Sequence, residues 1–456
     1  MPTVDTQSQQ KGADAPDTGR PSEVKPERID AAKDTAPVVV EPEEGKQEGK
    51  PASGLMARLT RWLERDPMPE PEEVLSLFTA RLTDVAANRR AKQWSARYLA
   101  ADARGRRQML GALTQASISL DPRDDQGLRL FRRLYAQAEN LKLLVEMRAD
   151  MLRWRKQMSG LSVLERELEG LLSAWFDVGM LELRPITWDS PASLLEKLIQ
   201  YEAVHEIRSW EELKHRVAGH RRCYAFFHPR MPDEPLIFVE VAFAPQMAGN
   251  VQVLLDPQVP AEDIAKARWA IFYSISNTQA GLKGISFGNF LLKRVIDELL
   301  RELPKLKSFA TLSPIPGFAD WLARQSGDEL QGVLVDKVDK QQALGDPEAG
   351  AKWVEKLRLA AAGQPSDAVQ KTGLRLAVHY LKSMKNGQPL DPVARFHLGN
   401  GARIERLNWA ADCSAKGMAQ SCGMMVNYLY ELDQLDDNLA SLAEGKPKLG
   451  INLRWR

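Results

Sequence analysis

A serine and a histidine in two separate segments of this 456-residue chain carry side chains that can move a proton. The first segment, FATLSPIPGF (309–318), places Ser313 at the end of a strand-like run, where Pro314 and Pro316 stop the strand. Ligands of open sheets often bind beyond such strand ends, so the Ser313 hydroxyl could lie in a ligand crevice. A turn-capping serine is the competing interpretation, and these residues alone leave it open.

The histidine lies in DPVARFHLGNG (391–401), which Pro392 opens and an Asn-Gly turn signal closes. His397 stands between Phe396 and Leu398, so its ring is expected to face away from these apolar neighbours. An imidazole can hold or release a proton near neutral pH, which makes His397 a candidate acid or base, although structural histidines are more common. The other histidines lack the spacing of a zinc site such as H-E-x-x-H, so no metal centre is predicted.

A third segment, QAGLKGISFGNFLLKRVIDELLREL (279–303), combines a glycine-rich loop with the start of a helix. A strand-like run (269–275) precedes the loop, and apolar residues at helical spacing follow it. The backbone N–H groups of a helix N-terminus favour anions, and Lys283 adds a positive charge. The spacing matches neither the dinucleotide motif G-x-G-x-x-G nor a P-loop, but the pyrophosphate of coenzyme A would suit it.

Two kinds of element must position these segments. Residues 55–180 are mostly helical in pattern, and apolar residues recur at helical spacing in stretches such as ENLKLLVEMRADMLRWRKQ (139–157), which predicts a helical bundle. After about residue 180 the pattern changes, and strand-like runs occupy residues 222–228, 235–243, 250–255, 269–275 and 307–313. Because helical patterns separate some of these runs, the second part is predicted to be a mixed sheet with helices.

The composition of the chain limits its functional class. There are 62 Lys+Arg and 61 Asp+Glu, so the net charge of +1 gives no default reason to bind nucleic acid. No apolar run reaches the roughly 20 residues of a membrane helix, and three cysteines without a C-x-x-C pair suit a reducing compartment. Residues 1–50 hold seven basic, eleven acidic and no aromatic residues, which predicts a disordered tail that is neither a secretory signal nor a transit peptide.

Taken together, these segments resemble the malonyl-CoA decarboxylase family. The resemblance rests on FHPRMPDEPLIFVEVAF (227–243), SISNTQAGLKGISFGNFLLKRV (274–295), FATLSPIPGF (309–318) and FHLGNGARIERLNWAADCSAKGMAQSCGMMVNYLY (396–430). It implies an α+β protein in which an all-α N-terminal helical bundle precedes a catalytic domain with the GCN5-related acetyltransferase fold, a mixed sheet that is splayed open. The predicted division is a disordered tail (1–52), a helical domain (53–180) and a coenzyme A-binding catalytic domain (181–456).

The resemblance also implies roles for particular residues. The family's catalytic serine and histidine fall on Ser313 and His397, and its coenzyme A loop falls on Lys283, Gly284, Ile285, Ser286, Phe287, Gly288 and Asn289. Some members carry a glutamate where this chain has Ser286, which leaves open what orients the histidine here. The implied ligands are malonyl-CoA and acetyl-CoA, and the implied assembly is a homotetramer formed through the helical domain. No cofactor, metal, nucleic acid or membrane partner is implied. The absence of a peroxisomal Ser-Lys-Leu ending favours a bacterial cytoplasmic enzyme.

The implied reaction is decarboxylation of malonyl-CoA to acetyl-CoA and CO2. Loss of CO2 leaves a thioester enolate, and Ser313 and His397 are predicted to form a hydrogen-bonded pair that helps to protonate its carbon. We expect a group that titrates near neutral pH. Two alternatives remain: an acyltransferase on the same fold, which would need an amine acceptor, and a helical scaffold that binds coenzyme A without turning it over.

Overall fold

The computed structural model describes residues 71–120, 125–138, 141–258, 264–285, 291–364 and 366–453. All of these residues belong to one compact unit, residues 68–456. The predicted disordered tail (1–52) therefore lies outside the described residues.

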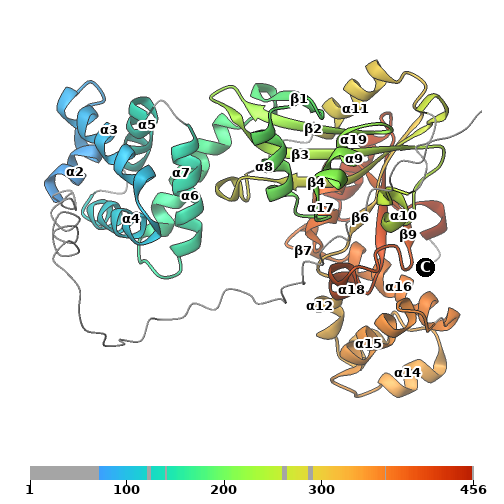
Figure 1. Cartoon of the computed structure of the whole chain (residues 1–456). Helices are drawn as coiled ribbons and strands as arrows, with labels where there is room; N and C mark the ends of the chain where they lie inside the picture. The colour runs from blue at the N-terminus through green and yellow to red at the C-terminus, as the bar shows by residue number, and fades with distance from the viewer. Residues whose placement is uncertain are drawn as a thin grey trace, which may run out of the picture. The chain divides into compact units, whose positions relative to one another are not determined.

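The first part of the described chain is entirely helical apart from its connections. Its helices are α2 (Pro71–Thr79), α3 (Val85–Ala100), α4 (Ala103–Ile118), α5 (Gln126–Ala138), α6 (Leu141–Trp154) and α7 (Leu161–Trp175). Asp102 begins α4 by accepting a hydrogen bond from the backbone N–H of Gly105. These helices lie side by side (Figure 1), and Leu110, Phe131 and Leu144 of their apolar faces are fully buried in the core. The predicted helical bundle is confirmed.

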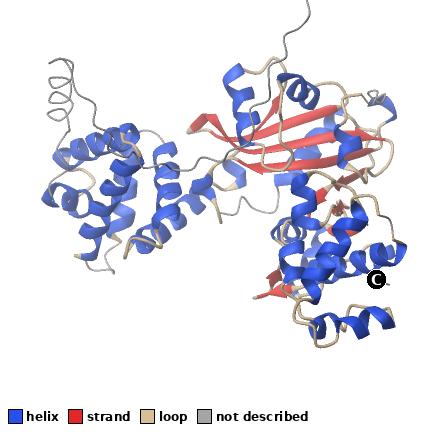
Figure 2. Ribbon diagram, turned by 60° about the horizontal axis from the view of Figure 1, so that its bottom comes forward, coloured by secondary structure: helices blue, strands red, loops and turns tan. Residues whose placement is uncertain are grey.

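The second part is built on a sheet with the strand order β1-β2-β3-β4-β5-β10-β6, and β9 pairs with β10. Its strands are β1 (Glu182–Ile186), β2 (Arg221–His228), β3 (Met231–Ala244), β4 (Trp269–Asn277), β5 (Ser308–Thr311), β6 (Ser313–Pro314), β9 (Arg403–Asn408) and β10 (Met425–Tyr430). The pairing of β4 with β5 is parallel, whereas the other pairings in this sheet are antiparallel. Helices lie against the sheet (Figure 2), so the predicted fold class, a helical bundle followed by a mixed sheet with helices, is confirmed.

Strands β4 and β5 separate part of the way along the sheet. Their register ends at Phe272 and Thr311, and the N–H of Leu312 still donates to the Phe272 carbonyl at 2.9 Å. Beyond this point β4 stays paired with β3 as far as Asn277, whereas β6 pairs with β10. The sheet therefore opens between β4 and β6, which is the splayed arrangement that the resemblance implies.

The remaining helices connect and cover the strands. They are α8 (Ala192–Tyr201), α9 (Trp210–Val217), α10 (Val251–Leu255), α11 (Leu291–Glu302), α12 (Phe318–Ala323), α13 (Gly327–Leu330), α14 (Lys337–Ala343), α15 (Ala349–Ala361), α16 (Asp367–Lys382), α17 (Pro392–Gly399), α18 (Ala415–Ser421) and α19 (Leu435–Ala443). A separate hairpin is formed by β7 (Met384–Lys385) and β8 (Gln388–Pro389). Among the described helices, none combines the length and the apolar character needed to cross a bilayer.

One predicted strand is wrong. The predicted strand at 250–255 is instead the short helix α10 with its cap, because the Asn250 side chain accepts a hydrogen bond from the N–H of Val253 and so caps the first turn. The N–H of Val251 is bonded to the Ala411 carbonyl, which fixes the start of this turn against the loop after β9. An apolar run of six residues does not distinguish a strand from a buried helix by its pattern alone.

Candidate active site

The Ser313 hydroxyl lies where the opened sheet forms a cavity. After β5 the chain passes through Leu312 and continues as β6, where Ser313 lies opposite Val426 of β10. The side chain is 5% exposed and lines a cavity of about 210 Å³, which we call the active-site cavity. Its walls come from β4 (residues 272–275 and 277), β6, α17 and the loop residue Val204. The predicted placement of this hydroxyl in a crevice agrees with the structure, while its catalytic role stays a prediction.

Helix α17 brings His397 to the same cavity. Asp391 caps this helix by accepting hydrogen bonds from the backbone N–H groups of Val393 and Ala394 at 2.9 and 2.8 Å, and Pro392 occupies its first turn. The imidazole is 3% exposed, and its Nε2 lies 3.2 Å from Ser313 Oγ. Two residues that are 84 positions apart in the sequence are therefore in hydrogen-bond contact, as predicted.

Two tyrosines of β10 complete the surroundings of the histidine, and the sequence reasoning missed both. The Tyr430 hydroxyl lies 2.8 Å from His397 Nδ1. The Tyr428 ring stacks on the imidazole, with ring centroids 4.6 Å apart and an interplanar angle of 27°. Their i, i+2 spacing in the strand-like run MVNYLY placed both on one face of a strand, and this alternation was the available signal.

The hydrogen bonds around His397 indicate which nitrogen carries the proton. Burial raises the pKa of Tyr430 well above its ordinary value of 10, so this phenol keeps its proton. Its only partner among the described residues is His397 Nδ1, and a buried hydroxyl proton without an acceptor is costly, so Tyr430 donates to Nδ1. Nε2 then carries the imidazole proton and donates to Ser313 Oγ, whose own proton goes to Thr311 Oγ1 at 2.8 Å.

The electrostatic state of His397 differs from the sequence expectation. Burial lowers the pKa of His397 from 6.5 to about 3, because a charged imidazolium would lose its hydration here. Tyr430 is a neutral partner, and none of the ion pairs found among the described residues involves this imidazole. His397 is therefore neutral between pH 5 and 8, and the expected titration near neutral pH does not belong to this residue.

The predicted coenzyme A loop is only partly described. Lys283 and Gly284 are exposed and Ile285 is buried, whereas Ser286, Phe287, Gly288 and Asn289 lie outside the described residues. Gly284 has a φ of +86°, a left-handed conformation that glycine adopts without strain. The structure joins Ser313 with His397, and the three described loop residues are not among those that line the active-site cavity.

A buried arginine of the helical part holds the start of this loop. Arg148 of α6 is 1% exposed, and its Nη1 donates to the carbonyls of Gly281 and Lys283 at 2.7 and 2.8 Å. Its other nitrogens pair with Glu165 and Glu169 of α7 at 3.0 and 2.8 Å. With five donors in a planar fork, an arginine can serve two carbonyls and two carboxylates at once. The sequence reasoning did not find this contact, because 133 residues separate Arg148 from Gly281.

Close packing adds to the hold of Arg148 on the loop. A Cβ on Gly281 would lie 1.8 Å from the carbonyl oxygen of Val145, so only glycine fits against helix α6 at this position.

Within the described residues, no group of three or more His, Cys, Asp or Glu side chains could hold a metal ion.

Comparison with protein-family models gives matches over most of the chain. The model of the malonyl-CoA decarboxylase C-terminal domain matches residues 179–447, and the model of the N-terminal domain of the same family matches residues 86–176. Among curated proteins, the mitochondrial malonyl-CoA decarboxylase of Anser anser anser is 38% identical over 378 residues, which cover 77% of this chain and 73% of the relative. The protein of the same name from Rattus norvegicus is 39% identical over 339 residues, or 70% of this chain and 68% of the relative.

Solved structures agree with these matches. The crystal structure of malonyl-CoA decarboxylase from Cupriavidus metallidurans is 53% identical, covers 84% of this chain and 98% of its own, and superposes with a TM-score of 0.75. The corresponding structure from Rhodopseudomonas palustris is 37% identical, covers 86% of this chain and 100% of its own, and gives a TM-score of 0.69.

Proposed function

The chain belongs to the malonyl-CoA decarboxylase family and is a carboxy-lyase of malonyl-CoA, and from this premise we propose how its residues carry out the reaction. The bond between C2 and the carboxylate carbon breaks, and its electron pair passes to C2 and into the thioester carbonyl. CO2 leaves, and the product is the enolate of acetyl-CoA. The thioester accepts the electron pair, so this step needs no further electron acceptor.

The developing negative charge on the thioester oxygen needs hydrogen-bond donors. We assign this role to the backbone of β4 beyond Phe272, because its pairing with β5 ends there and residues 273–275 and 277 line the active-site cavity. Donors that are fixed in a strand require no rearrangement when the charge forms. Removing one donor of this kind typically costs about 2.7–4 kcal/mol of barrier.

The enolate then takes a proton on C2 from Ser313. A neutral hydroxyl is acidic enough, since the α-carbon of a thioester is a far weaker acid than an alcohol. His397 Nε2–H donates to Ser313 Oγ and stabilises the negative charge that this oxygen then carries, while Tyr430 keeps its proton and holds Nδ1 as the acceptor. One proton that enters the active-site cavity from solvent restores the Ser313 hydroxyl. The net reaction consumes one proton and releases CO2 and acetyl-CoA, and the imidazole is never required to carry a positive charge.

This direction of the hydrogen bonds separates the site from that of an acyl-transferring serine. A serine nucleophile needs a histidine that accepts its proton and a neighbour that stabilises the resulting imidazolium. Here the neighbour is a phenol, and the pKa of His397 is lowered to about 3 by burial. The 3.2 Å contact between Ser313 and His397 inside the cavity is the observation that carries the proposal.

The first test follows acetyl-CoA by chromatography and mass after malonyl-CoA is added in the presence of EDTA. We expect stoichiometric acetyl-CoA, and replacing His397 or Ser313 by Ala should lower kcat by about 100-fold or more. Near-full turnover in either variant would remove that residue from the mechanism. Thiol release from acetyl-CoA only when amines are added would instead support the acyltransferase, and ligand binding without product would support the scaffold.

We also propose that residues 283–289 hold the coenzyme A pyrophosphate, with Lys283 supplying a positive charge. The Lys283→Glu variant should then raise KM for malonyl-CoA, and an unchanged KM would exclude this role.

From the resemblance we also propose that the chain assembles as a homotetramer through the helical domain and that it is located in a bacterial cytoplasm. Light scattering of the purified protein tests the first of these, and cell fractionation tests the second.

A further inference from the structure

A second cavity lies next to the active-site cavity, and one residue borders both. The second cavity has a volume of about 370 Å³ and is lined by the loop after α8 and by α9, α10 and α18. Its walls include several charged side chains, among them Arg216, which pairs with Glu240 at 3.0 Å. Among the described residues, Val204 alone belongs to the lining of both cavities. Val204 therefore stands at the boundary between the two spaces.

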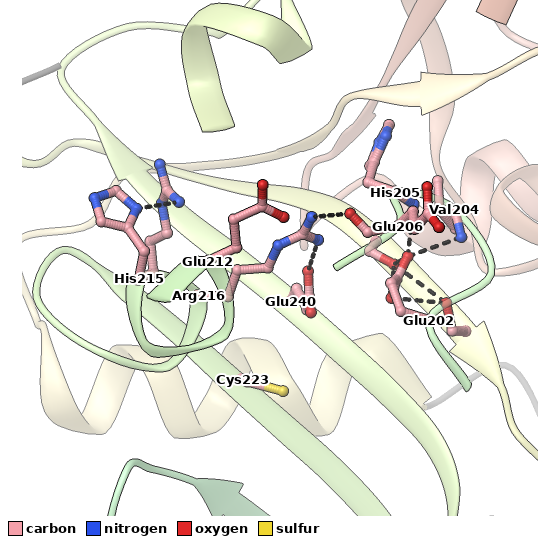
Figure 3. A network of polar contacts seen from close by, with 12 residues as sticks. Glu202, Val204, His205, Glu206, Glu212, His215, Arg216, Cys223 and Glu240 are labelled. Atoms are coloured by element: carbon pink, nitrogen blue, oxygen red, sulfur yellow. Dashed lines mark hydrogen bonds and ion pairs between the residues drawn. The ribbon is translucent and has the colours of Figure 1, made fainter. Parts of the chain in front are cut away.

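The loop that carries Val204 is held from the side of the sheet. Glu202 accepts hydrogen bonds from the backbone N–H groups of Val204 and His205 at 2.8 and 2.7 Å. The same carboxylate accepts from the hydroxyls of Ser274 and Ser276 on β4, at 2.8 and 3.1 Å. In Figure 3 these bonds converge on Glu202 directly beside Val204 and His205. A carboxylate that accepts several hydrogen bonds fixes the backbone of the loop to the wall of the active-site cavity.

The same loop is also held by helix α18 and by a further bond to β4. Lys416 of α18 donates from Nζ to the carbonyls of Ala203 and Val204, and the Ala203 N–H donates to Ser276 Oγ at 3.2 Å. With its N–H and its carbonyl both bonded, Val204 has little freedom to move aside for a ligand. The extent of this wall is thus set by the size of its side chain.

We propose that Val204 is the specificity-determining residue that limits the size of the substituent on C2 of the malonyl group. The inference rests on the proposed function, because it requires C2 to lie beside Ser313, in the cavity that Val204 borders. Malonyl-CoA carries only hydrogen at C2, so it fits against the valine. A branch at C2 must enter the space that the isopropyl group occupies. Shortening this side chain should connect the two cavities, so that the substituent on C2 can occupy part of the second one.

The test compares kcat/KM for ethylmalonyl-CoA and for malonyl-CoA in the intact chain and in three variants. Val204→Ala should raise the ratio of the two values about 10-fold or more, since one methylene in an apolar pocket typically changes kcat/KM by roughly 10- to 200-fold. Val204→Leu should lower the ratio. Val393→Ala is the matched control, because Val393 lines the active-site cavity but not the second one.

The outcomes separate the inference from the function on which it rests. A ratio that rises in Val204→Ala, falls in Val204→Leu and stays within about 2-fold in Val393→Ala supports the proposal. An unchanged ratio in both Val204 variants, equal loss of both activities, or an equal rise in Val393→Ala overturns it. Absence of acetyl-CoA from malonyl-CoA with the intact chain would instead refute the proposed function itself.

Discussion

Replacing Tyr430 by Phe tests the assigned hydrogen-bond directions most directly, because it removes one oxygen atom and leaves the ring in place. That oxygen lies 2.8 Å from His397 Nδ1, in a position that is 3% exposed. Without it the imidazole loses the donor that keeps Nδ1 free of hydrogen. The other tautomer then becomes accessible, in which Nε2 accepts from Ser313 and draws its proton away from the substrate.

The size of the effect follows from the burial of the pair. A buried acceptor left without its donor costs about 1–3 kcal/mol, and about 1.4 kcal/mol corresponds to a tenfold change in rate. If this cost falls on the transition state, Tyr430→Phe should lower kcat about 5- to 150-fold. KM for malonyl-CoA should change little, because Tyr430 does not line the active-site cavity.

The matched control is Tyr428→Phe. Both rings lie near the imidazole, with centroids 4.6 Å away for Tyr428 and 6.1 Å away for Tyr430. The Tyr428 hydroxyl is buried and has no hydrogen-bond partner among the described residues. Its removal should leave kcat within about 2-fold and should not lower the melting temperature, since an unsatisfied hydroxyl is removed.

Initial rates of acetyl-CoA formation give kcat and KM for both variants, and circular dichroism confirms that each is folded. Equal activity of Tyr430→Phe and the unmodified chain would refute the assignment of Tyr430 as the donor to His397. An equal loss in both variants would show that the rings, and not the one bonded hydroxyl, matter for turnover.

Three further predictions concern protonation and the loop. Burial lowers the pKa of His397 to about 3 in the folded chain, whereas the pKa in the unfolded chain is about 6.5. Between pH 3 and pH 6.5, His397 therefore binds a proton only in the unfolded chain. Stability should therefore fall as pH drops below about 6.5, and less steeply in His397→Gln, as urea titrations at pH 7 and pH 5 would show. Arg148→Met removes the donor to the carbonyls of Gly281 and Lys283, and it should raise KM for malonyl-CoA several-fold with kcat nearly unchanged. The control is Arg155→Met, which removes only a partner of Glu165 at 3.3 Å and should leave KM unaltered. Gly281→Ala should also raise KM, since its Cβ would lie 1.8 Å from the Val145 carbonyl oxygen, and the control is Gly332→Ala, whose Cβ meets nothing within 4 Å. Equal KM values in the variant and its control, in either pair, would show that these loop contacts do not affect substrate binding.

The elements that carry strong periodicity could be read from the sequence. Helical spacing over 139–157 predicted part of the bundle, and the apolar runs at 222–228 and 235–243 lie within β2 and β3. The run at 250–255 was wrongly predicted to be a strand, because its helical conformation depends on the Asn250 cap and on a hydrogen bond from Val251 to Ala411, which is remote in sequence. A short apolar run carries too little information to choose between helix and strand.

By itself, the sequence determined the residue types of the proposed chemistry. It singled out Ser313 at a strand end, His397 in a segment between Pro392 and an Asn-Gly turn, and a glycine-rich loop before a helix, because the constraints of proline and glycine act within a few residues. Tertiary structure alone decided the rest. Tyr430 as the partner of His397, Arg148 on the loop and Val204 between two cavities all depend on strands and helices that meet across long sequence separations. The low pKa of His397 has the same origin, since burial sums the exclusion of water by many residues that no local segment contains.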